Sequence, residues 1–247
     1  MKIFKSLFFI LIFPSMLHAQ VGGESVYQFL NISTSARQIA LGGKVLTLMD
    51  DVNQPIWNPS VINTNLNNQL AVNYSSYLSG INIGSISFSK ELNRRFGVLH
   101  GSIKYINYGS LIEADESGNI LGDFSASDIA LSVGYAFNFP KTNFYAGANV
   151  KFINSSISTY SSTGIAADFA LLYHNIYKPY ALTLVVRNIG TQVSSFNNQN
   201  EKLPLEIMLG GSYQLENVPI KWYVTIDNLQ QWDVSVSNPS NQTSDIE

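Results

Sequence analysis

The feature that most constrains this chain is a period of two in hydropathy, which recurs along most of its length. Between Asp128 and Phe139, large apolar residues occupy every odd position, and small or polar residues occupy every even one. A β-strand turns successive side chains to opposite faces, so this pattern predicts a strand with one apolar and one polar face. The same alternation, weaker in the first three cases, occurs at 69–77, 81–90, 95–107, 143–153, 164–175, 180–189, 205–215 and 220–228. We therefore expect an all-β chain of about nine antiparallel strands.

These strands have the character of a transmembrane barrel. At roughly ten residues each, they match the length that crosses a bilayer when tilted by about 45°. Val133, Phe169 and Leu184 are predicted to face lipid. The opposite face carries roughly one charge per strand, and we expect these residues to form a luminal polar network: Lys104, Asp128, Lys151, Asp168, Arg187, Glu206 and Asp227. A soluble β-sandwich remains the alternative, although its strands are usually about five or six residues long and charged residues make up only 13% of this chain.

The first 19 residues have the pattern of a cleaved signal peptide. Lys2 and Lys5 precede an apolar run that ends at Leu17, and Leu17-His18-Ala19 resembles a cleavage site before Gln20. The run is too short for a membrane-spanning helix. An exported chain without another such run can cross a membrane only as a closed barrel, because every backbone polar group must be paired in lipid. We therefore expect the bacterial outer membrane as its location.

The connections between the predicted strands alternate in length. Short connections at 91–94, 140–142, 176–179 and 216–219 alternate with longer polar segments at 108–127, 154–163 and 190–204. Short periplasmic turns opposite long external loops are typical of outer-membrane barrels. The expected organisation is a signal peptide at 1–19, a plug-like segment at 20–68, barrel strands at 69–229 and an external loop at 230–247. Because bacterial barrels have even strand numbers, we expect the chain to stop in that loop before the barrel is complete.

A motif in the segment before the strands carries a family resemblance. Residues 35–62, SARQIALGGKVLTLMDDVNQPIWNPSVI, are similar to the start of FadL-superfamily outer-membrane barrels of the PorV/PorQ group of Bacteroidetes. In that group A-R-x-x-A-L-G-G, a D-D pair and W-N-P recur. The motif residues here, which we assign to the plug, are Arg37, Gly42, Gly43, Trp57, Asn58 and Pro59. VGGESVYQFLNIS, YINYG, FSASDIAL and DNLQQWD are more similar to the PorQ branch, and the resemblance covers about Gln20 to Asp233.

The resemblance implies a role as well as a fold. Such barrels have an even number of strands, about fourteen, with about nine present here. The family belongs to the type IX secretion system. The implied function is a scaffold in its attachment complex, which holds a PorZ-like surface protein and, through it, PorU and PorV. That complex processes cargo and attaches it to lipopolysaccharide. From the external loops, the expected contact residues are Tyr108, Glu113, Asp115, Glu116, Phe124 and Phe196.

Little in the sequence points to catalysis. His100 and His174 have luminal parity but no triad-like surroundings. Gly42-Gly43-Lys44 fails the phosphate-loop motif, because Gln38 stands at its first glycine and Val45 follows the lysine. Without cysteine, disulfides and thiolate sites are excluded. The acidic run from Glu113 to Asp123 lacks the spacing of a calcium loop, and a net charge of -3 gives no footprint for nucleic acid.

These observations leave three functions open. We expect a non-enzymatic scaffold without cofactor, metal or nucleic acid. A FadL-type channel for uptake of small hydrophobic molecules is the first alternative. A periplasmic or secreted β-protein is the second, and it requires the sandwich fold.

Overall fold

The computed structural model of the protein describes residues 25–93, 96–197 and 199–231. The predicted signal segment 1–19 and residues 232–247 of the predicted last loop lie outside these ranges. Ser25–Gln230 form one compact unit. Within the described residues, no helix is long and apolar enough to cross a membrane.

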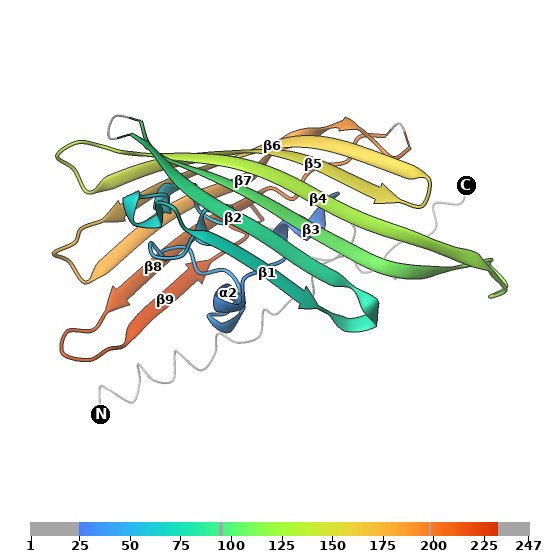
Figure 1. Ribbon diagram of the computed structural model, residues 1–247, viewed down its shortest axis with the longest axis horizontal. Coiled ribbons are helices and arrows are strands. Elements are labelled where there is room, and N and C mark those ends of the chain that lie inside the picture. Colours follow the sequence, from blue (N-terminus) through green and yellow to red (C-terminus); the bar gives the residue numbers. More distant parts are fainter. Residues whose placement is uncertain (1–24, 94–95, 198, 232–247) are drawn as a thin grey trace, which may run out of the picture. The chain divides into compact units, whose positions relative to one another are not determined.

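The described chain is all-β, as the alternation predicted. Nine antiparallel strands form one sheet, in which each strand lies beside its neighbours in sequence (Figure 1). The strands are β1 (Leu70–Ser76), β2 (Asn82–Asn93), β3 (Gly97–Ala114), β4 (Ile120–Asn138), β5 (Phe144–Ile157), β6 (Tyr160–His174), β7 (Tyr180–Ser194), β8 (Glu206–Gln214) and β9 (Lys221–Ile226). The prediction of about nine antiparallel strands is therefore confirmed.

Only short helices occur in the described residues. They are η1 (Gln28–Asn31), α2 (Ala36–Ala40), η2 (Gln54–Ile56), η3 (Pro59–Val61), η4 (Thr64–Leu66) and η5 (Leu78–Gly80). All except η5 precede β1, in the segment 25–69. Proline at the second residue of η2 and the first of η3 suits a helix start but not a helix interior. Gly42 and Gly43 both have positive φ, so the chain turns sharply after α2.

At one end of the sheet the strands extend further than predicted. We expected long loops at 108–127, 154–163 and 190–204. Instead, β3 continues to Ala114 and β4 begins at Ile120, while β5 and β6 are separated only by 158–159. For the first two segments the prediction was wrong, because it equated polarity with a loop. The third holds in large part, since the described residues between β7 and β8, 195–197 and 199–205, contain no strand.

At the end of β3 and β4 both faces are exposed, so the paired strands need no apolar face there and their hydropathy loses the period of two while their hydrogen bonds remain. At the end of β5 and β6 the buried face carries small polar residues, Ser155 and Ser162, which the sequence pattern does not separate from a loop.

The two faces of the sheet differ sharply. We call the face against which residues 25–69 lie the covered face, and the opposite one the uncovered face. Leu171, Leu184, Leu209 and Ile226 are paired side by side across β6 to β9 and are exposed on the uncovered face. Charged residues of alternate parity, such as Asp168 and Arg187, are buried on the covered face. The sheet therefore has an exposed apolar face and a buried polar one.

Candidate functional site

The segment 25–69 is attached to the covered face through the W-N-P motif. The Asn58 side chain accepts hydrogen bonds from the backbone N–H and hydroxyl of Ser60, at 3.0 and 2.5 Å, and so caps η3. Its amide group donates to the Leu46 carbonyl at 2.7 Å and to Thr183 Oγ1 of β7 at 3.1 Å. Asn58 thus uses both ends of its side chain, one to shape η3 and the other to hold it on the sheet.

The next motif residue lies directly on a glycine of the sheet. η3 contacts β4, β5 and β6. A Cβ atom at Gly147 of β5 would fall inside contact distance of the Pro59 and Ser60 backbone. Gly147 therefore leaves the space that lets η3 approach the strand closely.

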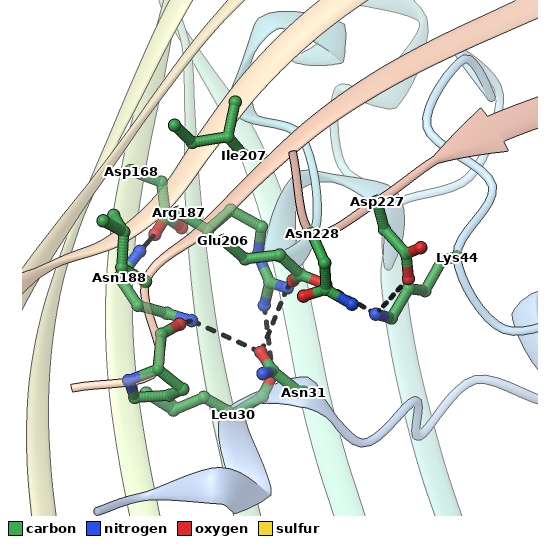
Figure 2. Close-up of polar contacts among 12 residues, drawn as sticks. Leu30, Asn31, Lys44, Asp168, Arg187, Asn188, Glu206, Ile207, Asp227 and Asn228 are labelled. Atoms are coloured by element: carbon green, nitrogen blue, oxygen red, sulfur yellow. Dashed lines mark hydrogen bonds and ion pairs between the residues drawn. The ribbon is translucent and has the colours of Figure 1, made fainter. Parts of the chain in front are cut away.

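Arg187 of β7 connects three parts of the molecule (Figure 2). Its guanidinium forms an ion pair with Glu206 of β8 at 2.8 Å and donates to the Leu30 carbonyl at 3.0 Å. The guanidinium also lies 4.1 Å from the centre of the Trp57 ring, a cation–π contact. The side chain is fully buried. A buried charge is tolerated only where it is paired and hydrogen-bonded, and Arg187 meets this condition by using the N-terminal segment as well as the sheet.

Lys44 extends the network to the last strand. Its Nζ lies 2.5 Å from Glu206 Oε1 and 2.6 Å from Asp227 Oδ2, just beyond β9 (Figure 2). The Thr225 hydroxyl donates to the Lys44 backbone carbonyl at 2.7 Å. Burial disfavours the charged lysine, but its bonds with Asp227 and Glu206 prevail and raise the Lys44 pKa above its ordinary value. Lys44 therefore remains a cation that joins the N-terminal segment to β8 and β9.

A second buried pair lies beside the first. Lys151 of β5 and Asp168 of β6 form an ion pair in which Nζ lies 2.8 Å from Oδ2. Asn188 connects them further, because its side chain accepts from Lys151 at 2.8 Å and its backbone N–H donates to Asp168 at 2.9 Å. Lys104 contacts no carboxylate of the described residues and donates instead to the backbone carbonyls of Leu30, at 3.1 Å, and Ile32. The carbonyl groups of the N-terminal segment thus satisfy both Arg187 and Lys104.

The beginning of the segment packs at the end of the sheet where β7 and β8 connect. The Val26 N–H donates to the Lys202 carbonyl at 3.0 Å, and the Tyr27 hydroxyl bonds to Ser162 at 2.5 Å. Phe29 and Leu30 belong to a buried apolar cluster with Ile106 and Ile153 of the sheet. Burial raises the pKa of Tyr27. The segment therefore covers the sheet with an apolar layer at this end and with polar contacts further along.

The predicted polar residues largely come together. Six of the seven are buried on the covered face, and Asp227 is half-exposed against Lys44. Lys44 and Asn188 were missed. One signal for a further cation was available: the predicted set holds three cations and four carboxylates, so it lacks one positive charge, which Lys44 supplies. Asn188 gave no such signal, since its role depends on a backbone with positive φ.

The predicted contact residues lie in three different surroundings. Tyr108 donates to Asp128 Oδ2 at 2.7 Å on the covered face, and Phe196 packs against the N-terminal apolar cluster. Phe124 lies in β4, opposite Leu111. Glu113, Asp115 and Glu116 are exposed at the end of the β3–β4 hairpin, as expected of contact residues, although Glu113 belongs to a strand. The proposal that these six act together in loops was wrong in that respect, because half of them lie in paired strands.

The remaining motif residues lie at the surface of the segment. Arg37 forms an exposed ion pair with Asp50 at 3.0 Å, and this contact raises the pKa of Arg37.

His100, the sheet histidine considered above, is buried, and its Nε2 lies 3.0 Å from the Val52 carbonyl oxygen. No three His, Cys, Asp or Glu side chains of the described ranges are placed to hold a metal ion.

The contacts of the site are structural, because they attach the N-terminal segment to the sheet. The charged groups of the site bond to one another and to the backbone of the N-terminal segment, which holds that segment in place. No protein-family model matches the chain, and no curated protein matches it. The features that bear on function are therefore the two faces of the sheet and the contacts between the sheet and the N-terminal segment.

Proposed function

We propose that the chain forms an outer-membrane β-barrel whose interior is filled by the N-terminal segment, and that it acts as a scaffold and not as an enzyme. The observation that carries this proposal is the uncovered face. Large apolar side chains are exposed on it over several strands: Val133, Val150, Phe152, Ile165, Phe169, Leu171, Leu182, Leu184, Leu209, Val224 and Ile226. A soluble monomer rarely exposes a continuous apolar patch of more than a few hundred Å². Contact with lipid, as on the outward face of outer-membrane barrels, would stabilise such a face.

The edges of the sheet support closure into a barrel. β1 and β9 each have one neighbour in the described chain, so each has a row of backbone groups without a strand partner there. Such edges are not tolerated in hydrocarbon, where each unpaired group costs several kcal/mol. We therefore propose that further strands pair with these edges and complete a FadL-like barrel of about fourteen strands, an even number as in other bacterial barrels.

The role in type IX secretion rests on the resemblance of residues 35–62. Three residues that carry it have clear positions: Trp57 lies under Arg187, Asn58 caps η3, and Pro59 lies on Gly147. We propose that the barrel belongs to the PorQ branch, reaches the outer membrane through a cleaved signal peptide, and holds a PorZ-like surface protein. Through this protein it acts with PorU and PorV when cargo is attached to lipopolysaccharide.

Two measurements test this function. Washing membranes with alkaline carbonate removes peripheral proteins, so the full-length protein should stay in the pellet. Its recovery in the wash would contradict the membrane location. Deleting the gene should release the PorZ-like protein from the cell surface, and restoring the gene should return it. Unchanged surface display without the barrel would contradict the scaffold role and leave the membrane location intact.

The second candidate is a FadL-type channel for small hydrophobic molecules. A hollow of about 490 Å³ near the β9 edge is relevant to it, and its lining includes Asn31, Lys44 and Thr225. The lining also includes Leu41, Val45 and Tyr223, so it mixes polar and apolar groups, which suits a purely hydrophobic ligand less well than an apolar pocket does. We therefore favour the scaffold. Uptake of a hydrophobic dye into vesicles containing the barrel, together with unchanged display of the surface protein, would instead favour the channel.

A further inference from the structure

The β3–β4 hairpin extends beyond the rest of the sheet. The pairing of β2 with β3 ends at Asn107, and the pairing of β5 with β4 ends at Ala126. Beyond these positions β3 and β4 pair only with each other, from Ser110 opposite Ser125 to Ala114 opposite Ile120. We call residues 110–125 the β3–β4 ribbon. At roughly 3.4 Å per residue, its five-residue β3 arm extends about 17 Å. Figure 1 shows it projecting past the neighbouring strands.

The ribbon exposes apolar side chains that no other described part of the chain covers. Ile112, Ile120 and Leu121 have exposed fractions of 65%, 71% and 66%. Leu111 pairs with Phe124. Because successive residues alternate between faces, this pair lies on one face of the ribbon and Ile112 lies on the other.

A two-stranded ribbon alone in water is marginally stable. The Ser125 carbonyl at the base of the ribbon accepts from the Ser158 N–H at 2.9 Å. Beyond this bond, both faces and both edges of the ribbon are available for further contacts.

The ribbon is also strongly acidic. It carries Glu113, Asp115, Glu116 and Asp123, and no lysine or arginine occurs between Lys104 and Lys141. The Asp115 carboxylate holds the turn by accepting from the N–H groups of Ser117 and Asn119, at 2.9 and 2.7 Å. Bonds from the Asn119 side chain and backbone lower the Asp115 pKa, so this charge persists at neutral pH. The other three carboxylates are not needed for the turn.

We propose that the β3–β4 ribbon inserts into a cleft of the surface protein that the barrel holds, and that this cleft has apolar walls and basic residues at its base. The inference rests on the proposed scaffold function and names the element and the chemistry that serve it. Apolar groups on opposite faces fit a cleft that closes on the ribbon from both sides. Asp115 and Glu116, in the turn at the tip, favour cations at the base of that cleft, and Asp123, paired with Ile112, favours one on its wall.

A lipid surface fits the ribbon less well. It would contact one face of the ribbon only. Anionic lipid headgroups would also repel the four carboxylates. A protein cleft satisfies both faces and the charge, and for this reason we assign the ribbon to a protein partner.

Binding of the purified PorZ-like protein to the detergent-solubilised full-length barrel tests the inference. The first variant replaces 111–124 by Asn-Gly, because Ser110 and Ser125 face each other and Asn-Gly suits a two-residue hairpin turn. The second is Ile112→Ser with Leu121→Ser, and the third is Glu113→Gln with Glu116→Gln. Matched controls at the opposite end of the sheet are Ile176→Ser, at an exposed apolar residue, and Glu216→Gln, at an exposed acid.

The expected result is a loss of affinity of at least about tenfold in the first two variants, the size of effect seen when interface anchors are removed. The third should bind more weakly at low salt and depend less on salt, because fewer charges attract the partner. The controls should bind as the wild type does. Retention of each variant's compact, heat-modifiable form on gels shows that the barrel is still assembled.

Other outcomes overturn one proposal or both. Wild-type affinity in the shortened variant would overturn the role of the ribbon and leave the scaffold function standing. Failure of the wild type itself to bind the PorZ-like protein would overturn the scaffold function. If the shortened variant bound the protein normally but lost adhesion to lipopolysaccharide vesicles, the ribbon would belong to the lipid surface. If it lost only self-association, the ribbon would contact a second copy.

Discussion

At the scale of single residues, the covered face shows how the buried Arg187 and Lys104 and the partly exposed Lys44 can lie together. Arg187 and Lys44 share Glu206, and Arg187 also donates to the carbonyl of Leu30. Lys104 completes the set by donating to carbonyls of the N-terminal segment. Because desolvation opposes every buried charge, such a network gains little overall but tolerates no missing member.

This view predicts a large effect of Glu206→Ala. The change leaves Arg187 buried without its carboxylate and should lower the free energy of unfolding by about 3–5 kcal/mol. Asp50→Ala breaks the exposed pair with Arg37 and should cost about 0–1 kcal/mol. Urea unfolding of both variants in the same detergent measures the difference. Equal midpoints would mean that the buried pair contributes no more than the exposed one.

Part of the network followed from the sequence alone. Parity placed Asp168 and Arg187 on one face because a strand has a fixed period of two. The pairing itself did not follow, since it depends on which strands lie side by side and on segment carbonyls that no side-chain pattern reveals. Lys104 illustrates this, because its partners are the backbone of Leu30 and Ile32.

At the scale of elements, the length of each strand was harder to predict than its existence. Alternation appears where one face meets an apolar and the other a polar environment, as in the middle of β4. It fades in the β3–β4 ribbon, where water surrounds both faces. The hydropathy pattern therefore identified the central parts of the strands and missed their extensions.

The close packing of η3 on β5 gives a prediction at this scale. Gly147→Ala places a methyl group against the backbone of Pro59 and Ser60 and should destabilise the protein by about 1–3 kcal/mol. Gly101→Ala, in β3, meets open space and should change stability by no more than about 0.5 kcal/mol. Thermal unfolding and protease sensitivity of the segment 25–69 report both effects. A tolerated Gly147→Ala would show that η3 does not lie this close to the strand.

The uncovered face gives another prediction, which depends on the proposed membrane location. Val133 is exposed in the middle of β4, so Val133→Arg should impair assembly, at a cost of about 2–4 kcal/mol for a cation at mid-bilayer depth. Ile176→Arg, in the connection between β6 and β7, is the matched control and should assemble. Folding into lipid vesicles, followed by gel mobility, measures the yield. Equal yields would argue against lipid on this face.

Ser132 is not a suitable control for Val133→Arg. Ser132 is the neighbour of Val133 in sequence and faces away from it, so an arginine there would not meet lipid. The structure buries Ser132 on the covered face, directly opposite Lys151. An arginine there would meet both a filled space and a like charge, so Ser132→Arg should be harmful as well.

At the scale of the whole molecule, the two ends of the sheet are chemically distinct. One end carries the connections 139–143 and 175–179, and the other carries the ribbon and the connection between β7 and β8. In the proposed orientation the ribbon end faces outward. The absence of cysteine allows single-cysteine labelling against a clean background.

Thr159→Cys, between β5 and β6, should react with a membrane-impermeant maleimide on intact cells. Lys178→Cys, at the opposite end, should react only after the outer membrane is opened. Both side chains are exposed, so accessibility to solvent does not separate them. The reverse pattern of labelling would show that the barrel is inserted in the other orientation.

The attachment of the N-terminal segment also has a consequence for the order of folding. Tyr27 bonds to Ser162, Arg187 to Leu30 and Lys44 to Asp227, across sequence separations of 135, 157 and 183 residues. Contacts this distant in sequence are slow to form, because closing the long loop costs conformational entropy before the contacts can lower the free energy. The residues that emerge early in synthesis therefore wait for the last strands to arrive. A chaperone that holds the unfolded chain until then would act on a kinetic interval built into this topology.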